Sequence, residues 1–354
     1  MIYIMLSCLS LVSCIGYASD TQSTYKETVV AGNFYAKKYV LNKNVTDYKS
    51  ASSDSFFVGE NRDNKSEILV FDRKHGYKHH ITLQSHFDLN SYRDPKMAII
   101  QDEYLMSAHK DTDGLWIDKI GTTSSSKNIK LKQDETFQKH GWSHPINHLH
   151  AVPKQSNVVS FEHRDAVFLD ITTEQIISTF SCPANQSSIL TVIPNSCGTG
   201  IFYRTGKVSE KVGSIGHYDM RSKDNTLFEA ELPFDITPLS ANGDNSRCMV
   251  QSARRLVIYD VKTGKKEFPM YLLDDKKEVK TALFADNDTI LFATENTKEK
   301  EYALHSMALS SGDVKTSQLK DDVCGISHHH DSRLLFETDL WGNIKVVYDV
   351  GFTQ

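Results

Sequence analysis

Residues 326–350, ISHHHDSRLLFETDLWGNIKVVYDV, carry the pattern that decides the fold. Two short runs, LLFET at 334–338 and IKVVYDV at 344–350, are rich in apolar, β-branched and aromatic residues. The turn-forming residues of DLWGN lie between them. Such runs, bounded by Gly, Asn and Asp, are typical of β-strands joined by tight turns. The second run contains an apolar residue followed by Asp349, and this pair recurs along the chain.

The apolar–Asp pair recurs at a nearly regular interval. It ends strand-like runs at Asp72, Asp118, Asp170, Asp219, Asp260 and Asp349. The first four intervals are 46, 52, 49 and 41 residues, and the fifth, 89, is close to two periods. The missing member falls near Met307, where the strand and its turn remain without the Asp. A four-strand unit repeating at this period predicts an all-β, seven-bladed β-propeller with four-stranded antiparallel blades.

The two ends of the chain are expected to complete one blade together. The sequence stops just after the third strand of the last repeat, so the fourth strand must come from elsewhere. FYAKKYVL, residues 34–41, has strand character and precedes the first full repeat. We expect this N-terminal strand to pair with the last blade and close the ring. Residues 31–354 are then one propeller domain, preceded by a polar linker at 19–30.

Residues 326–350 resemble the WD-repeat pattern, and so does the segment around 143–170. In the latter, Ser143-His144 stands where the family has Gly-His, Asp165 stands in the tight turn between the second and third strands, and Leu169-Asp170 replaces Trp-Asp. The resemblance implies that His144 hydrogen-bonds toward Asp165 and holds the blade together. A related seven-bladed propeller family remains the alternative.

The recurring aspartates are interpreted as structural because they recur so regularly. Their expected role is to accept backbone hydrogen bonds where a strand meets a turn. Asp170, Asp260 and Asp349 are the representatives of this group.

The first eighteen residues carry no charge, and Gly16 and Ala18 place small side chains before a cleavage site. This pattern predicts a signal peptide at 1–18 and an exported protein, periplasmic or secreted. The string LVSC at 11–14 also resembles a lipobox, in which Cys14 would be acylated. A membrane-anchored lipoprotein, or a retained leader, is therefore the alternative.

The four cysteines outside this leader form no CxxC pair, which argues against a cysteine zinc site. In an exported protein Cys182 and Cys197 could form a disulfide. The other interpretation is that they are small buried apolar residues.

Charge and motifs exclude several functions. The net charge is −5, so no nucleic-acid partner is expected. The serine-hydrolase elbow, the HExxH zinc motif and the phosphate-binding loop are missing from the sequence. We therefore expect no enzyme and no cofactor. An enzyme or ligand-binding protein that uses the central channel is the alternative.

Histidine is abundant, with 15 copies. His148 and His150 alternate along a strand and so share a face, which is a geometry that suits zinc or copper. They are only weak candidates, and the favoured interpretation is that the chain holds no metal.

The candidate binding residues lie on one rim, which in this architecture carries the connections between blades and the turns between second and third strands. Two long connections, at 84–95 and 132–145, supply the aromatic and arginine side chains that dominate many binding surfaces. The candidates are Tyr92, Arg93, Asp113, Phe137, Trp142, Arg164 and Trp341. The predicted function is a scaffold that binds an unidentified protein or peptide through this rim.

Overall fold

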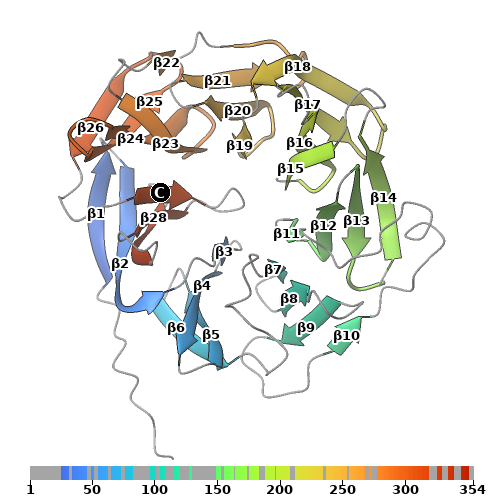
Figure 1. Cartoon of the computed structure of the whole chain (residues 1–354), viewed down its shortest axis with the longest axis horizontal. Coiled ribbons are helices and arrows are strands. Elements are labelled where there is room, and N and C mark those ends of the chain that lie inside the picture. Colours follow the sequence, from blue (N-terminus) through green and yellow to red (C-terminus); the bar gives the residue numbers. More distant parts are fainter. Residues whose placement is uncertain are drawn as a thin grey trace, which may run out of the picture.

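The computed structural model describes the strands between Tyr25 and Val350, together with many side chains between 150 and 318. Side chains in that range are described except at 153–154, 158, 160–163, 174, 183–187, 196, 207–211, 230–239, 252–254 and 268–276. The regular structure described is all β, and Figure 1 shows its sheets arranged around a common centre. In these described parts, no helix is long and apolar enough to span a membrane.

Six sheets contain four antiparallel strands each, and in every one the strands follow chain order. The strands of the first three are β3 (Lys49–Ala51), β4 (Ser55–Arg62), β5 (Lys65–Asp72), β6 (Gly76–Thr82); β7 (Lys96–Ile100), β8 (Tyr104–Ala108), β9 (Leu115–Lys119), β10 (Lys127–Ile129); β11 (Leu149–Ala151), β12 (Asn157–Glu162), β13 (Asp165–Asp170), β14 (Gln175–Ser181). Those of the next three are β15 (Ser188–Pro194), β16 (Gly200–Lys207), β17 (Val212–Asp219), β18 (Asn225–Pro233); β19 (Thr237–Ala241), β20 (Arg247–Ser252), β21 (Arg255–Asp260), β22 (Tyr271–Leu272); β23 (Lys277–Phe284), β24 (Thr289–Asn296), β25 (Glu301–Ala308), β26 (Val314–Gln318). The first strand of each sheet lies toward the common centre (Figure 1).

A five-stranded sheet joins the two ends of the described chain. Its order is β1 (Tyr25–Ala31), β2 (Phe34–Val45), β29 (Ile344–Val350), β28 (Leu334–Thr338) and β27 (Gly325–His328). β2 pairs antiparallel with β29, with Lys38 opposite Tyr348. The structure differs from the linker expected at 19–30, because β1 begins at Tyr25 and adds a fifth strand outside β2.

Neighbouring sheets bury one another's faces. β16 shows this clearly, because residues 200–206 are all buried and do not alternate between buried and exposed. Ile201 and Tyr203 face the β11–β14 sheet, whereas Phe202 faces the β19–β22 sheet. A strand covered on both faces carries apolar residues on both, as in a stack of packed sheets, and β16 also buries Arg204 and Thr205.

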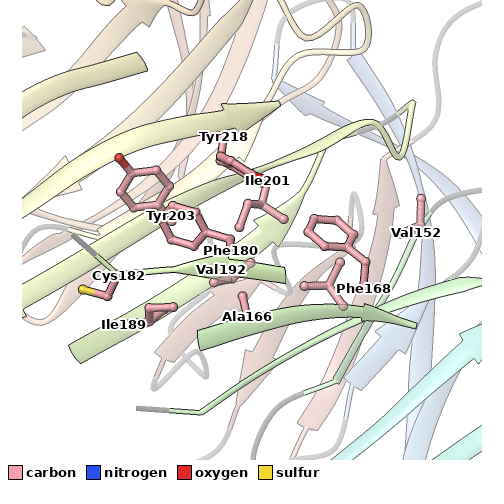
Figure 2. Close-up of a cluster of buried hydrophobic side chains, with 11 residues drawn as sticks. Val152, Ala166, Phe168, Phe180, Cys182, Ile189, Val192, Ile201, Tyr203 and Tyr218 are labelled. Carbon is pink, nitrogen blue, oxygen red and sulfur yellow. The ribbon is translucent and has the colours of Figure 1, made fainter. Parts of the chain in front are cut away.

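Aromatic side chains fill the spaces between these sheets. Between the β11–β14 and β15–β18 sheets, the Phe180 ring lies 4.6 Å from that of Tyr203 and 5.0 Å from that of Tyr218 (Figure 2). In the next space, Phe228 stacks on Tyr259 at 5.4 Å. Burial of such large rings stabilises these two interfaces, since the hydrophobic gain scales with the apolar area removed from water.

Candidate functional site

The two ends of each four-stranded sheet carry different connections. At one end lie the turns between the first and second strands and between the third and fourth strands; we call this end the turn face. At the other end lie the turns between the second and third strands and the connections to the next sheet; we call this end the rim. The sequence predicts the binding residues on the rim, so each end is described in turn.

On the turn face, the recurring aspartates accept hydrogen bonds from the turns that follow them. Asp170 Oδ1 accepts from the Thr172 N–H at 2.8 Å. Asp219 Oδ1 accepts from the backbone of residues 221 and 222 at 2.8 and 2.9 Å, and Asp260 Oδ1 accepts from both the N–H and the hydroxyl of Thr263 at 2.6 Å. Hydrogen bonds from Ser222 and from Thr263 hold the pKa values of Asp219 and Asp260, respectively, below the usual range. The side chain of Asp349 lies outside the described residues.

Buried asparagines shape the turns between first and second strands. Asn195 is 2% exposed, and its Oδ1 accepts from the backbone of residues 199 and 200 at 2.9 and 3.1 Å. Asn242, 1% exposed, accepts from the Arg247 N–H at 2.9 Å. Three residues after each Asn, Gly198 and Asn245 have φ values of 65° and 60°. Gly and Asn tolerate this left-handed conformation best. The two turns therefore have the same left-handed position and the same type of Asn hydrogen bond.

Hydrogen bonds also link these turns from sheet to sheet. The Gln155 side chain donates to the Cys197 carbonyl at 2.6 Å, and the Asn245 amide donates to the Cys197 sulfur at 3.4 Å. Arg247 donates to the Asn287 carbonyl at 2.8 Å and pairs with a glutamate of its own sheet. On the described part of the turn face, many polar side chains are therefore hydrogen-bonded to backbone groups of the turns.

Cys182 and Cys197 are not bonded to each other. Both are free thiols; Cys182 is buried near the rim, whereas Cys197 is exposed on the turn face. Burial raises the pKa of Cys182 to about 11. Of the two interpretations left open by the sequence, the structure excludes the disulfide.

At the rim, Arg164 lies in the turn between β12 and β13, and Asp165 is the first residue of β13. Arg164 is exposed and donates through Nη2 to the Cys182 carbonyl at 3.1 Å, while the Cys182 N–H donates to the Arg164 carbonyl at 2.6 Å. Asp165 is buried, and its Oδ1 accepts from the Ser181 hydroxyl at 2.6 Å. The end of β14 thus holds this turn in place. His144, the partner implied for Asp165, lies outside the described residues.

The other rim candidates are not described. Tyr92, Arg93, Asp113, Phe137, Trp142 and Trp341 all lie outside the described residues, so their predicted grouping stays a prediction. His148, a weak metal candidate, also lies outside the described residues. His150 is buried on β11 opposite Val159, and no group of three or more His, Cys, Asp or Glu side chains in the described parts could hold a metal ion.

A charged triad at the rim of the β23–β26 sheet was not anticipated from the sequence. Glu295 at the end of β24 is 5% exposed and binds two lysines. Lys280 Nζ lies 2.7 Å from Oε2, and Lys300 Nζ lies 2.8 Å from Oε1. Burial alone would raise the pKa of Glu295, but the hydrogen bonds and charges of the two lysines outweigh it and leave that pKa lowered. Glu295 therefore stays ionised, and the triad carries a net charge of about +1.

The backbone is irregular at both lysines of this triad. Lys280 is the extra residue of a β-bulge, because Val279 pairs with Thr294 and Thr281 with the next residue, Ala293. Lys300 has φ 60° in the turn between β24 and β25. That turn is fixed by Asn296, whose carbonyl accepts from the Lys300 N–H at 2.7 Å and whose Oδ1 accepts from the Lys298 N–H at 3.2 Å. The same bulge occurs in β15 and β19, and Lys223 also has a left-handed backbone with φ 63°, so both features recur in other sheets.

A second polar network lies inside the same sheet. His305 on β25 is buried, with Nε2 2.8 Å from the Thr294 hydroxyl and Nδ1 2.9 Å from the Thr316 hydroxyl. Its ring stacks on Phe292 at 4.7 Å. Burial, with a smaller contribution from the charge of Lys277, lowers the pKa of His305 to about 4. This neutral histidine ties the three outer strands of the sheet together.

Four-stranded antiparallel sheets packed face to face around a common centre define a β-propeller-like, all-β protein. No protein-family model matches the chain, and no curated protein matches its sequence. Among solved structures, it is similar to the hydrazine synthase of Kuenenia stuttgartiensis. The match has a TM-score of 0.53 and 11% sequence identity, and it covers 84% of this chain and 94% of that chain. At this identity the likeness concerns the fold alone.

Proposed function

We propose that the chain is an exported, non-enzymatic scaffold of WD-repeat type, built on a seven-bladed propeller, and that its rim binds a protein or peptide. The pairing of β2 with β29 supports the proposal that an N-terminal strand completes the last blade. Contacts between the first strands of successive sheets, from β3 and β7 through to β23 and β27, together with contacts between β2 and β4, support a ring in which every blade packs on two neighbours. A rigid ring of this kind holds its loops in fixed relative positions, which lowers the entropy cost of binding.

We assign the binding surface to the rim because its described side chains differ from those of the turn face. On the turn face, Asp219, Asp260, Asn195 and Asn242 are engaged with their own backbone. On the rim, Lys300 presents a largely exposed ammonium group beside Glu295, and Arg164 is exposed although its Nη2 donates to the Cys182 carbonyl. Preorganised, exposed side chains of this kind suit recognition.

The test compares baits altered on each face. The rim bait carries Tyr92→Ala, Trp142→Ala and Trp341→Ala; the control bait carries Lys262→Ala and Lys265→Ala on the turn face. Each is used in an affinity pull-down with mass spectrometry beside the unaltered chain, after thermal unfolding has shown equal stability. A partner retained by the unaltered and control baits and lost by the rim bait supports the proposal. Equal recovery by all three baits contradicts it, and metal analysis and ligand screening of the central channel then become the next measurements.

A further inference from the structure

The sheet that joins the two ends of the described chain has one strand more than its neighbours. The six other sheets contain four strands each, and β27, β28, β29 and β2 already form a four-stranded sheet of the same kind. This sheet meets its neighbours through contacts of β27 with β23 and of β2 with β4. β1 is the fifth strand and pairs with β2 alone. It therefore lies on the outer edge of a sheet that has its four strands without it.

β1 covers the regular part of that edge. β2 pairs with β29 without interruption from Ala36 to Val40, and the register then shifts between Val40 and Val45. The ladder of β1 covers Phe34–Tyr39, so it ends beside the last regularly paired residue of β2. A long, regular strand edge presents a row of backbone donors and acceptors to any further strand. The position of β1 thus coincides with the stretch of β2 that is best suited to strand addition.

The outer edges of the other sheets suit strand addition less well. Three of their outermost strands are short, because β10, β22 and β26 have three, two and five residues. The other three, β6, β14 and β18, are interrupted by register shifts against their neighbours. Short or bulged edge strands discourage further pairing. Among the described sheets, the edge that combines length with regular pairing is therefore that of β2, and this edge carries the added strand.

A strand at this edge gains more than a backbone ladder. β1 also contacts β25 and β26 of the neighbouring sheet, and Figure 1 shows it beside β26. In the β1–β2 register, Glu27 stands opposite Lys37 and Val29 stands opposite Tyr35. Oppositely charged pairs and pairs of an aromatic with a β-branched residue each stabilise antiparallel strands at such positions. The edge therefore favours a strand of matching sequence.

We propose that the edge of β2 at Phe34–Tyr39 is a strand-addition site, which β1 occupies within the chain and a partner occupies when β1 is displaced. The partner is an extended peptide segment that resembles β1, with β-branched or aromatic residues and a carboxylate opposite Lys37. Backbone hydrogen bonds provide the affinity, and the paired positions provide the specificity. The site lies on the outer edge of a blade, so this inference is independent of the rim proposed above.

β1 is suited to act as the internal competitor. Only residues 32 and 33 separate it from β2, so its effective concentration at the edge is high. It is also the first strand of the described chain and is held by a single ladder, so it can leave without breaking any other strand pair. An external segment therefore binds well only when β1 is released.

The test measures fluorescence anisotropy of a labelled peptide with the sequence of residues 23–31, STYKETVVA. The release variant of the full chain carries Glu27→Pro and Thr28→Pro. Alternate N–H groups of a strand face its partner, so two adjacent prolines remove at least one ladder donor of β1. We expect the release variant to bind the peptide at least about tenfold more tightly than the unaltered chain. The matched control, Thr21→Pro with Gln22→Pro, places the same prolines before β1 and is expected to bind as the unaltered chain does.

Two charge reversals in the release variant test the register. Lys37→Glu is expected to weaken peptide binding about threefold, because it places a carboxylate opposite Glu27 of the peptide. Lys38→Glu is expected to strengthen binding by a similar factor, because the residue opposite it is Lys26. A peptide with Lys at the position of Glu27 should restore the affinity of the Lys37→Glu variant.

Each outcome decides for or against the strand-addition site. Binding confined to the release variant, with opposite responses to the two charge reversals, supports it. No binding by the release variant, equal binding by the unaltered chain, a gain in the control, or equal responses to the two reversals overturns it. Thermal unfolding of the release variant is measured in parallel, and loss of its cooperative transition also overturns the inference, because the blade is then incomplete without β1. None of these results depends on the pull-down with the rim bait, so the proposed function is tested separately.

Discussion

Asp288 Oδ2 accepts a 2.5 Å hydrogen bond from the Ser310 hydroxyl, and Asp288 Oδ1 accepts from the Ser310 N–H at 3.1 Å. These bonds join the turn after β23 to the turn after β25. In the β11–β14 sheet the same two turns are also joined, but the donor and the acceptor are exchanged. Ser156 of the first turn donates to Asp170 at the end of β13. The β23–β26 sheet has Ala308 at the position of Asp170. The aspartate missing from the repeat is therefore replaced by one from a different turn.

Replacing Asp288 by Ala should lower the free energy of unfolding by about 1 kcal/mol, since it removes hydrogen bonds to a charged acceptor at a partly exposed site. Ser310→Ala should cost less, because the backbone bond to Asp288 remains. Urea unfolding of both single variants and the double variant gives the coupling energy, which we expect to be about 0.5–1 kcal/mol. Additive effects of the two substitutions would show that the turns are not coupled through this pair.

Much of the repeat could be predicted from the sequence, because it depends on short-range patterns. The last two runs of 326–350 are β28 and β29, and residues 34–41 lie in β2. Strand β25 has no aspartate at its end, and the expected turn of residues 311–313 follows it. The residue that replaces this aspartate could not be predicted. Asp288 lies 22 positions before Ser310, and only the packing of the sheet brings the two turns together.

The charged triad was missed for a similar reason. KKEVK and ENTKEKEY look like ordinary solvated turns that mix both signs. A β-bulge shifts the register by one residue, so alternation along the chain cannot show that Lys280 and Glu295 meet. Nor does the sequence show that a lysine adopts the left-handed conformation at position 300, because glycine is the usual signal of that conformation.

The glycines of the turns after third strands should differ in their sensitivity to substitution. Gly312 has φ 75°, and a Cβ there would meet no atom within 4 Å, so Gly312→Ala should cost about 1 kcal/mol from backbone strain alone. A Cβ at Gly264 would also lie 2.9 Å from the Leu227 carbonyl, and Gly264→Ala should therefore cost more. Gly243→Ala is the matched control, because its nearest neighbour is an ordinary 3.5 Å contact. Chemical denaturation should rank the losses as Gly264, Gly312, Gly243, and any other order contradicts the strain argument.

The three described thiols should react at very different rates. Cys197 is exposed, whereas Cys182 and Cys248 are buried, and burial raises the pKa of both buried thiols. Iodoacetamide treatment of the native protein, followed by peptide mass spectrometry, should label Cys197 and leave the other two unmodified until denaturant is added. A disulfide-linked peptide containing Cys182 and Cys197 under non-reducing conditions would contradict this arrangement.

The buried His305 should make stability depend on pH. Its pKa is about 4 in the folded chain and about 6.5 when the chain unfolds, since burial disfavours the charged ring. Between these values the unfolded state binds a proton that the folded state does not. Stability should therefore fall as the pH drops from about 6.5 to about 4, by at most about 3 kcal/mol from this residue.

His305→Gln keeps polar groups near Thr294 and Thr316 but does not titrate. His217, whose pKa burial also lowers, contributes to the pH dependence of both proteins, so the difference between them isolates His305. Urea unfolding across this pH range should give a shallower slope for His305→Gln, and identical slopes would mean that His305 is not held neutral by the fold.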